Sequence, residues 1–363
     1  MRLSQKLPCK SCDFHKNSLA KVVQVVYLNF FENPDYCSVF EGSLEIDNIT
    51  MLLSALLGSE AVFEPGNTIL VLDEIQECPD ARTALKFFHL DGRYDVIGTG
   101  SLLGVRGYGK EPKSIPVGYE TTIDMNPLDF EEFLWANGIS DVVIDSLRKN
   151  IRGVTPVPEA LHKKMRQLLL QYTVVGGMPD VVQTFVDTKR LDEVLNMQRD
   201  IVRSYEDDMI KYANQKDKSR ILECFQSIPK QLSKENKKFQ YSVVKKGSTA
   251  SKYAGSLQWI EDAGIISRCY NLISDMFTKM GRKLYYFHKN SGLEVDFVIR
   301  YKRECTLVEV KASSGNTKST KTILAHPEKY HVHSAIKLGD YNVGKSSEIL
   351  TLPLYMAFLL TEV

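Results

Sequence analysis

The chain has 363 residues, of which 43% are hydrophobic and 25% are charged. This length predicts two or three domains, and this composition is typical of a soluble globular protein. Because 46 Lys and Arg residues balance 45 Asp and Glu residues, the overall charge predicts neither a nucleic-acid partner nor a membrane partner. Either partner would have to be inferred from a local patch.

Seven cysteines are scattered along the sequence. An odd number in a long chain argues against a disulfide framework and for a reducing compartment. No stretch reaches the roughly 20 apolar residues that span a bilayer, and the N-terminal residues lack the apolar core of a signal peptide. The sequence therefore predicts a cytoplasmic protein without a membrane partner.

The first third of the chain alternates buried strands with amphipathic helices. Strands are predicted at 22–31, 69–72 and 94–101, because apolar residues follow one another there with little alternation. Helices are expected over 45–58 and 80–90, where apolar residues recur at helical spacing. This order predicts an α/β fold with a parallel sheet flanked by helices.

Two adjacent carboxylates follow the second predicted strand. Ile69–Leu72 leads directly into Asp73 and Glu74, at the carboxyl edge where open α/β sheets bind ligands. This is the Walker B arrangement of nucleotide hydrolases, in which the first acid holds Mg²⁺ and the second polarises the attacking water. The alternative is an ordinary strand followed by an acidic loop.

Small polar residues end the next predicted strand. In P-loop ATPases the strand beside Walker B carries a group that senses the γ-phosphate. Thr99 and Ser101 are the candidates for that role here. The alternative is a simple Gly/Ser turn.

The middle of the chain is predicted to be helical. The loop 105–117, rich in Gly, Lys and Pro, precedes a helix that we expect to start at Asn126, with Pro127 in its first turn. Gly153–Pro158 breaks the pattern and predicts a domain boundary, and helices then continue to about residue 226 except at 176–179.

Residues 217–272 resemble a winged-helix arrangement. Helices are predicted at 219–232 and 250–262, with a short strand inside the basic stretch 234–246. Lysines in and after that stretch are candidates for contacts with nucleic-acid phosphates, although a solvated lysine face is the alternative. These lysines are Lys234, Lys237, Lys238, Lys245, Lys246 and Lys252.

The last part is predicted to be rich in β-strands, at 284–287, 293–299 and 306–311, and to close with the apolar segment 349–360. Asp296 lies in the second of these strands, and Glu309 and Lys311 lie two residues apart in the third, on one face. A carboxylate beside a Glu-x-Lys is the core of the PD-(D/E)xK nuclease site.

In that site the two acids, here Asp296 and Glu309, bind a divalent ion, and the lysine, here Lys311, orients or activates the water. Only a weak metal site is expected from these two acids. The alternative is a cross-strand ion pair at the end of a sheet.

Together these segments resemble a family of prokaryotic AAA-type ATPases with a C-terminal domain of unknown function built like a restriction endonuclease. The resemblance implies an AAA core that uses ATP and Mg²⁺, then a winged-helix segment, then a small α/β nuclease-like domain. The matching stretches are VVYLNFFENPDY (25–36), ILVLDEIQECPDA (69–81), YDVIGTGSLLGV (94–105), NPLDFEEFLWANG (126–138), VVGGMPDVV (174–182), SIPKQLSKENKKFQY (227–241), SLQWIEDAGII (256–266), LEVDFVI (293–299) and LVEVKAS (307–313).

The sequence departs from that family at the phosphate-binding loop. Lys10 and Ser11 stand where the family has Gly-Lys-Ser or Gly-Lys-Thr, but Ser4 and Cys9 replace the two glycines. The loop needs glycines because its backbone N–H groups must wrap the phosphates. The strand that precedes the loop in the family is also missing. Lys10 and Ser11 remain the candidates for contacts with phosphate and Mg²⁺.

A second departure lies where Asp275 runs almost directly into Gly281. The family has there a helix that bears a further acid of the nuclease site. We therefore expect an AAA core over 1–155, a helical and winged-helix region over 156–275, and a shortened nuclease-like domain over 276–363.

The sequence predicts an ATP-binding, AAA-type protein with impaired hydrolysis, and a homo-oligomer is a further expectation from the family. Candidates for an arginine that completes a neighbour's site are Arg93, Arg106, Arg199 and Arg203. One alternative is a DNA-binding protein with an inactive nuclease-like domain. The other is a degraded gene product.

Overall fold

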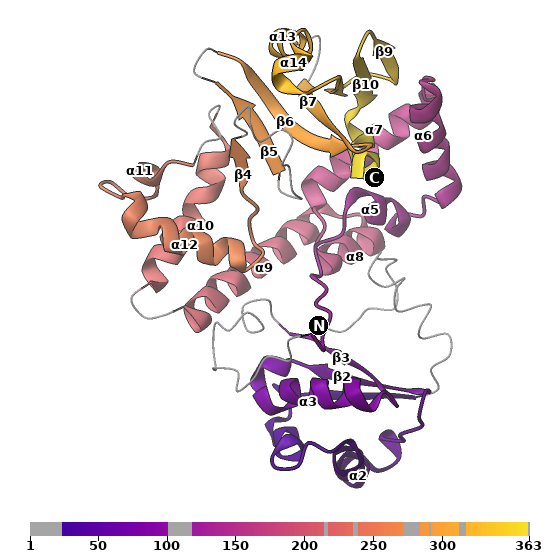
Figure 1. The fold of residues 1–363 in the computed structure, drawn as a ribbon, viewed down its shortest axis with the longest axis vertical. Helices are drawn as coiled ribbons and strands as arrows, with labels where there is room; N and C mark the ends of the chain where they lie inside the picture. The colour runs from indigo at the N-terminus through magenta and orange to yellow at the C-terminus, as the bar shows by residue number, and fades with distance from the viewer. Residues whose placement is uncertain are drawn as a thin grey trace. The chain divides into compact units, whose positions relative to one another are not determined.

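Figure 1 draws the computed structural model as a ribbon. Its residues form two compact units. One, here called the three-stranded unit, comprises the described residues of 24–125 and 201–266, and the other, the seven-stranded unit, comprises the described residues of 126–200 and 267–361. The structure describes residues 24–100, 118–213, 217–234, 239–271, 284–289, 292–311 and 317–361.

Three parallel strands form the sheet of the three-stranded unit, in the order β1-β2-β3. The helical segments between them give the predicted strand–helix alternation. The strands are β1 (Gln24–Asn29), β2 (Thr68–Asp73) and β3 (Asp95–Gly98); the helical segments are η1 (Pro34–Phe40), α2 (Ile46–Leu57), η2 (Gly58–Glu60), η3 (Ile75–Glu77) and α3 (Pro79–Asp91).

The two α-helices α2 and α3 pack on the same face of this sheet. Val26 and Leu28 of β1 lie in one buried cluster with Leu70 and Leu72 of β2 and with apolar residues of both helices. On the other face of β1, Val25 and Tyr27 are about half exposed, at 49% and 51%. The strand order confirms the predicted parallel sheet, while the described helices cover only one of its faces.

A set of helices opens the seven-stranded unit, and the first of them starts later than predicted. It begins at Phe130, not at Asn126, because Asp129 and Glu132 form a reciprocal capping box: the Asp129 side chain accepts the Glu132 N–H at 3.0 Å and the Glu132 side chain accepts the Asp129 N–H at 2.9 Å. The helices are α5 (Phe130–Ala136), α6 (Asp141–Gly153), α7 (Glu159–Val175), α8 (Pro179–Thr188) and α9 (Leu191–Tyr212), which continues past the unit's boundary at residue 200.

The segment interpreted as a winged helix contains α10 (Lys218–Leu232), α11 (Tyr241–Val244) and α12 (Ala250–Asp262). Within 239–246, the described part of the stretch expected to hold a short strand, the backbone forms the helical turn α11 instead. The next strand, β4 (Cys269–Asn271), pairs in parallel with a strand of the large sheet. The winged-helix interpretation is therefore not confirmed.

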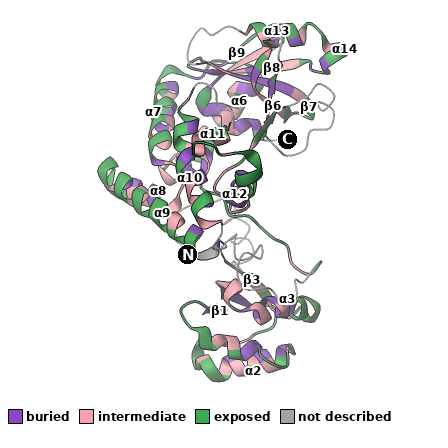
Figure 2. Cartoon of the chain, turned by 90° about the vertical axis from the view of Figure 1, so that its left-hand side faces the viewer, coloured by how far each residue is buried: buried purple, intermediate pink, exposed green. Residues whose placement is uncertain are grey.

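The second sheet follows the order β4-β5-β6-β7-β8-β10-β9. Its strands β5 (Leu284–His288), β6 (Glu294–Tyr301) and β7 (Glu304–Lys311) lie where the sequence predicted three strands, and they are antiparallel neighbours. Beyond them β7 pairs in parallel with β8, and buried residues are interspersed with partly buried ones along these strands (Figure 2). The remaining elements are α13 (Lys318–Leu324), α14 (Pro327–Tyr330), β8 (Ser334–Gly339), β9 (Gly344–Ser346), β10 (Ile349–Pro353) and η5 (Leu354–Thr361).

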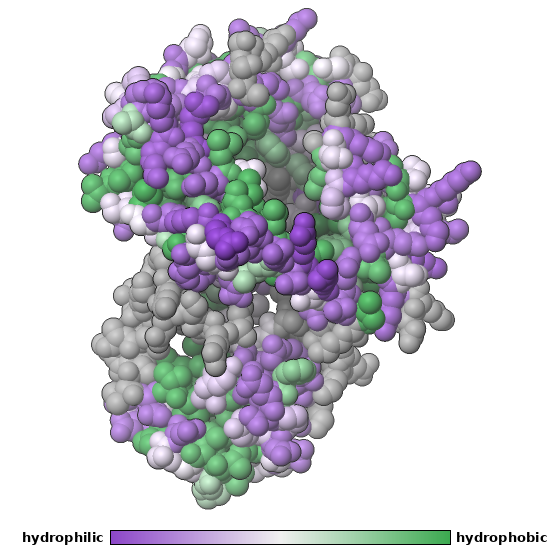
Figure 3. Space-filling model, turned by 180° about the vertical axis from the view of Figure 1, so that it is seen from behind, coloured by the Kyte–Doolittle hydropathy of each residue, from purple (hydrophilic) through white to green (hydrophobic). Residues whose placement is uncertain are grey.

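Among the described helices, none combines the length and the apolar character that crossing a membrane requires. The face drawn in Figure 3 carries hydrophilic residues interspersed with hydrophobic ones.

Candidate functional site

Asp73 is a buried carboxylate at the end of β2, with 4% of its surface exposed. One of its oxygens, Oδ1, accepts the Thr99 hydroxyl and, at 3.1 Å, the backbone N–H of Glu74. The other, Oδ2, accepts the Tyr27 hydroxyl and, at 3.2 Å, the side-chain amide of Asn29. Four donors from three strand ends thus converge on one carboxylate.

This convergence follows from the register of the parallel sheet. Asn29 pairs with Asp73 and Leu72 pairs with Gly98, so the carboxyl ends of the three strands meet at one edge. The chain just beyond β3 is held there because the Thr99 N–H donates to Leu72 O and the Thr99 carbonyl accepts the N–H of Ile75, both at 2.9 Å. The structure therefore brings together Asp73 and Thr99, which the sequence singled out separately.

The hydrogen bonds keep Asp73 ionised. Burial by itself raises the pKa of a carboxyl group, but the hydrogen bonds from Thr99 and Tyr27 favour the charged form and outweigh it, so the pKa of Asp73 lies below its ordinary value of 3.8. A buried, ionised carboxylate at the carboxyl edge of a parallel sheet is suited to hold Mg²⁺, which prefers oxygen ligands and keeps several of its waters.

Glu74 leaves the line of the strand at once. Its backbone has φ 53° and ψ 44°, in the left-handed region that residues other than glycine rarely adopt. Glu74 immediately precedes η3. The side chain is partly exposed, and its Oε2 accepts a hydrogen bond from the amide of Gln76. Such backbone strain is concentrated at functional sites. The predicted phosphate contacts Lys10 and Ser11, and the second sensor candidate Ser101, lie outside the described residues.

The sequence analysis did not single out two residues at this edge as candidates. Tyr27 and Asn29 stand two apart on β1, so both side chains lie on the face of the strand opposite Val26 and Leu28. The available signal was a hydroxyl and an amide within an apolar strand, ending level with the acid of the neighbouring strand.

The second acidic cluster lies in the large sheet, where β6 and β7 bring all three predicted residues together. The Lys311 ammonium is 2.8 Å from Glu309 Oε2 and 3.3 Å from Asp296 Oδ2. Asp296 Oδ2 also accepts the backbone N–H of Val310 at 2.8 Å, and Glu309 Oε1 accepts the Thr320 hydroxyl at 2.7 Å. Glu309 is 3% exposed, so the lysine neutralises a buried charge.

An open hollow of about 420 Å³ lies over this cluster and is also lined by Glu294, Lys318 and Ser319. Burial lowers the pKa of Lys311, but the hydrogen bond to Glu309 and the charges of Glu309 and Asp296 raise it above its ordinary value of 10.5. Lys311 is therefore held in its ammonium form between the two carboxylates. Among the residues the structure describes, no three His, Cys, Asp or Glu side chains form a group that could hold a metal ion.

Among the described basic residues around α10–α12, at least one is neutralised by a carboxylate. Lys245 is paired with Glu223 at 2.7 Å, and the same carboxylate accepts the Tyr253 hydroxyl at 2.6 Å. Lys246 and Lys252 are exposed and Lys234 is partly exposed, while Lys237 and Lys238 lie outside the described residues. Of the arginines proposed to complete a neighbour's site, Arg93 is paired with Asp47 and Asp91, and Arg106 is not among the described residues.

The parallel sheet thus brings a buried acid, a second acid and a hydroxyl together at one edge. Comparison with known families shows that residues 13–134 match the model of an AAA domain. Residues 166–288 and 269–355 match two domains of unknown function, DUF8612 and DUF4143. No curated protein matches the chain.

Among solved structures, the Walker-type ATPase PABY2304 of Pyrococcus abyssi is similar, with 14% sequence identity and a TM-score of 0.36. The match covers 66% of this chain and 78% of that one.

Proposed function

We propose that this protein binds ATP together with Mg²⁺ at the carboxyl edge of β1, β2 and β3. The observation that carries the proposal is the hydrogen bond between Thr99 and the ionised Asp73, two residues that end neighbouring parallel strands. The match of residues 13–134 to an AAA domain supports it independently of the side-chain geometry.

The residues have distinct roles in this proposal. Asp73 holds the hydrated ion, Glu74 polarises the attacking water, and Thr99 senses the γ-phosphate through its hydroxyl. Bound Mg²⁺ would neutralise charge on the phosphates. Lys10 and Ser11 would contact phosphate and Mg²⁺, and the replacement of the two loop glycines by Ser4 and Cys9 would impair hydrolysis.

The test measures the affinity of a fluorescent ATP analogue with and without Mg²⁺. We expect Asp73→Asn to lower the Mg²⁺-dependent part of the affinity by roughly tenfold, the value of one interaction with a charged group. Asp95→Asn is the matched control, because Asp95 is an exposed carboxylate at the opposite end of β3. Affinity that does not respond to Mg²⁺, or that falls equally in both variants, would contradict the proposal.

A second candidate function rests on the convergence of Asp296, Glu309 and Lys311. Under it, the seven-stranded unit is a nuclease-like domain whose own metal site is weak, and the protein binds DNA through lysines of the α10–α12 segment. The order of antiparallel β5, β6 and β7 followed by parallel β8 suits a restriction-endonuclease-like sheet.

Its test compares DNA affinity over a range of salt concentrations. Lys246→Ala is expected to weaken binding and to lower the salt slope by about one unit. Lys245→Ala should change both less, because Glu223 already neutralises Lys245. Binding that ignores salt would rule out this function, and cleavage that survives Lys311→Ala would rule out the nuclease-like site.

A further inference from the structure

The carboxylate of Asp73 has no acceptor position left over. An ionised carboxylate offers about four positions for hydrogen-bond donors. Here two donors occupy each oxygen: Thr99 and the N–H of Glu74 on Oδ1, Tyr27 and Asn29 on Oδ2. A hydrated divalent cation, whose waters must donate to the same carboxylate, therefore has to displace one of these donors.

Three of the four donors are fixed by other interactions. The N–H of Glu74 belongs to the backbone, and Thr99 is held by backbone hydrogen bonds at both its N–H and its carbonyl. The Asn29 amide is oriented by its own oxygen, which accepts the backbone N–H groups of Phe31 and Glu32, each at 2.9 Å. Displacing the Glu74 N–H or the Asn29 amide would disturb the end of a strand or the turn after it, and the backbone of Thr99 is held beside Asp73.

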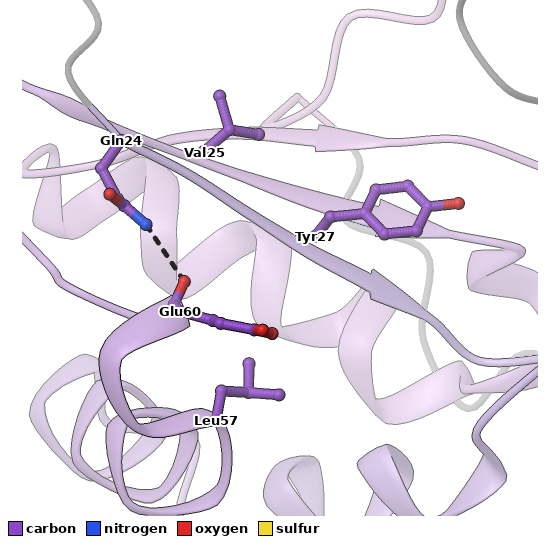
Figure 4. Close-up of a pocket in the computed structure, with 5 residues that line it drawn as sticks. All are labelled: Gln24, Val25, Tyr27, Leu57 and Glu60. Atoms are coloured by element: carbon purple, nitrogen blue, oxygen red, sulfur yellow. Dashed lines mark hydrogen bonds between the residues drawn. The ribbon is translucent and has the colours of Figure 1, made fainter.

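Tyr27 differs from the other three donors. Its residue is 51% exposed, and it lines an open hollow of about 380 Å³ beside β1. Figure 4 shows the ring extending from β1 away from Gln24, Glu60 and Leu57, which also line the hollow. The hydroxyl can leave Asp73 by rotation of an exposed side chain, without any change of the backbone.

We propose that Tyr27 is a positioning residue whose hydroxyl competes with a divalent cation for Oδ2 of Asp73. This inference rests on the proposed function, because it concerns the same carboxylate, but it predicts something that ATP binding alone does not. Tyr27→Phe keeps the ring and removes the competing donor. Cation affinity at Asp73 should then rise by roughly tenfold, the worth of one hydrogen bond to a charged group.

The test uses Mn²⁺ alone, which takes oxygen ligands as Mg²⁺ does. Free Mn²⁺ is measured by electron paramagnetic resonance in the presence of the full chain, without nucleotide. Each protein is compared with its own Asp73→Asn counterpart, so that binding at any other acidic cluster is subtracted. Tyr36→Phe is the control, because Tyr36 is partly buried against the core of the same unit.

We expect Tyr27→Phe to bind Mn²⁺ about tenfold more tightly than the unchanged chain, and Tyr36→Phe to bind as the unchanged chain does. A purely structural role for Tyr27 would lower the thermal unfolding midpoint without changing the affinity. Unchanged or weaker binding in Tyr27→Phe overturns the inference, and so does the lack of any Asp73-dependent binding in both proteins.

The binding of the ATP analogue separates this inference from the proposed function. If the analogue binds in an Mg²⁺- and Asp73-dependent way while Tyr27→Phe leaves Mn²⁺ affinity unchanged, only the competition by Tyr27 fails. If Tyr27→Phe tightens Mn²⁺ binding while the analogue does not bind, the competition stands and the nucleotide function fails.

Discussion

The two acidic clusters of this protein stabilise their carboxylates in opposite ways. At the end of β2, the hydrogen-bond donors to Asp73 are neutral: two hydroxyls, an amide and a backbone N–H. In the large sheet, Asp296 and Glu309 share the charged ammonium of Lys311. Both arrangements satisfy the oxygens, but only the second supplies a positive charge from within the cluster.

This difference indicates which cluster should respond to an added cation. Neutral donors keep Asp73 ionised without cancelling its charge, and a divalent ion can still gain from that charge. Lys311 already neutralises part of the charge of Glu309 and Asp296, so an added ion would have to displace it or be repelled by it. We therefore expect cation-dependent function at the edge of the three-stranded sheet rather than in the large sheet.

The largest expected effect concerns turnover. Glu74→Gln should lower any ATP hydrolysis by about 100-fold or more, because it removes the group proposed to polarise water. The affinity for the analogue should stay within about twofold, since the amide and the carboxylate have the same shape. Steady-state phosphate release at saturating ATP measures the hydrolysis. Lys311→Met is the control. An equal loss of ATP hydrolysis in that variant would show that the two clusters do not differ in this function.

The next largest effect is on stability and concerns the close approach of Gly339 to the backbone of Lys311. A Cβ at Gly339 would lie 2.1 Å from the carbonyl oxygen of Lys311 and 2.4 Å from the ring of Tyr341. Gly339→Ala should lower the free energy of unfolding by about 3 kcal/mol, the upper range for overpacking. Urea unfolding measures it, with Gly344→Ala as the control because nothing lies within 4 Å there. Equal stability of the two variants would show that Gly339 is not under this constraint.

Removing the ammonium should convert the second cluster into one like the first. Lys311→Met leaves the buried Glu309 without its cation, and we expect a loss of roughly 2 kcal/mol, less than for a fully buried pair because the lysine side chain is 28% exposed. Added Mg²⁺ should restore part of this stability in the variant and not in the parent. Urea unfolding with and without Mg²⁺ measures this. An equal change of stability with Mg²⁺ in Lys311→Met and in the parent would contradict the proposed difference between the two clusters.

The smallest effects are expected in the pH dependence of the free energy of unfolding. The first cluster should lose its contribution at acid pH and the second at alkaline pH. The pKa of Asp73 is lowered by folding, so its contribution is present above about pH 4, its unfolded value, and is lost as the pH falls through the folded value. The pKa of Lys311 is raised, so its contribution is present below about pH 10.4 and is lost as the pH rises through the folded value.

Unfolding free energies over a pH series measure both contributions. Asp73→Asn should flatten the acid side, and Lys311→Met the alkaline side. An unchanged acid side in Asp73→Asn, or an unchanged alkaline side in Lys311→Met, would contradict the corresponding pKa shift.

Much of the first cluster could be predicted from the sequence, because the relevant signals are local. The apolar run before Asp73 identifies a buried strand, and strands joined by helices align their carboxyl ends, so that Thr99 follows with little more information. Gln76, which holds Glu74, could not be predicted, because that contact depends on the left-handed backbone at Glu74.

The start of α5 shows why some local signals mislead. Asn126-Pro127 is a good start for a helix, but Leu128 donates its N–H to the carbonyl of Gly177 at 2.7 Å, far along the chain. A Cβ at Gly177 would lie 2.1 Å from the Leu128 carbonyl oxygen. This close approach keeps the chain extended as far as Asp129, whose capping box with Glu132 then starts the helix.

The sequence by itself determined the alternation of strands and helices over residues 24–98, the parallel sheet there, the strands β5–β7 and the acids at the two clusters, because hydrophobic periodicity and strand ends are properties of neighbouring residues. The tertiary structure alone decided which donors meet those acids: Tyr27 and Asn29 at Asp73, and one shared lysine between Asp296 and Glu309. Such contacts join residues distant in the chain, and their formation depends on the register of paired strands and on side-chain rotamers that no local pattern encodes.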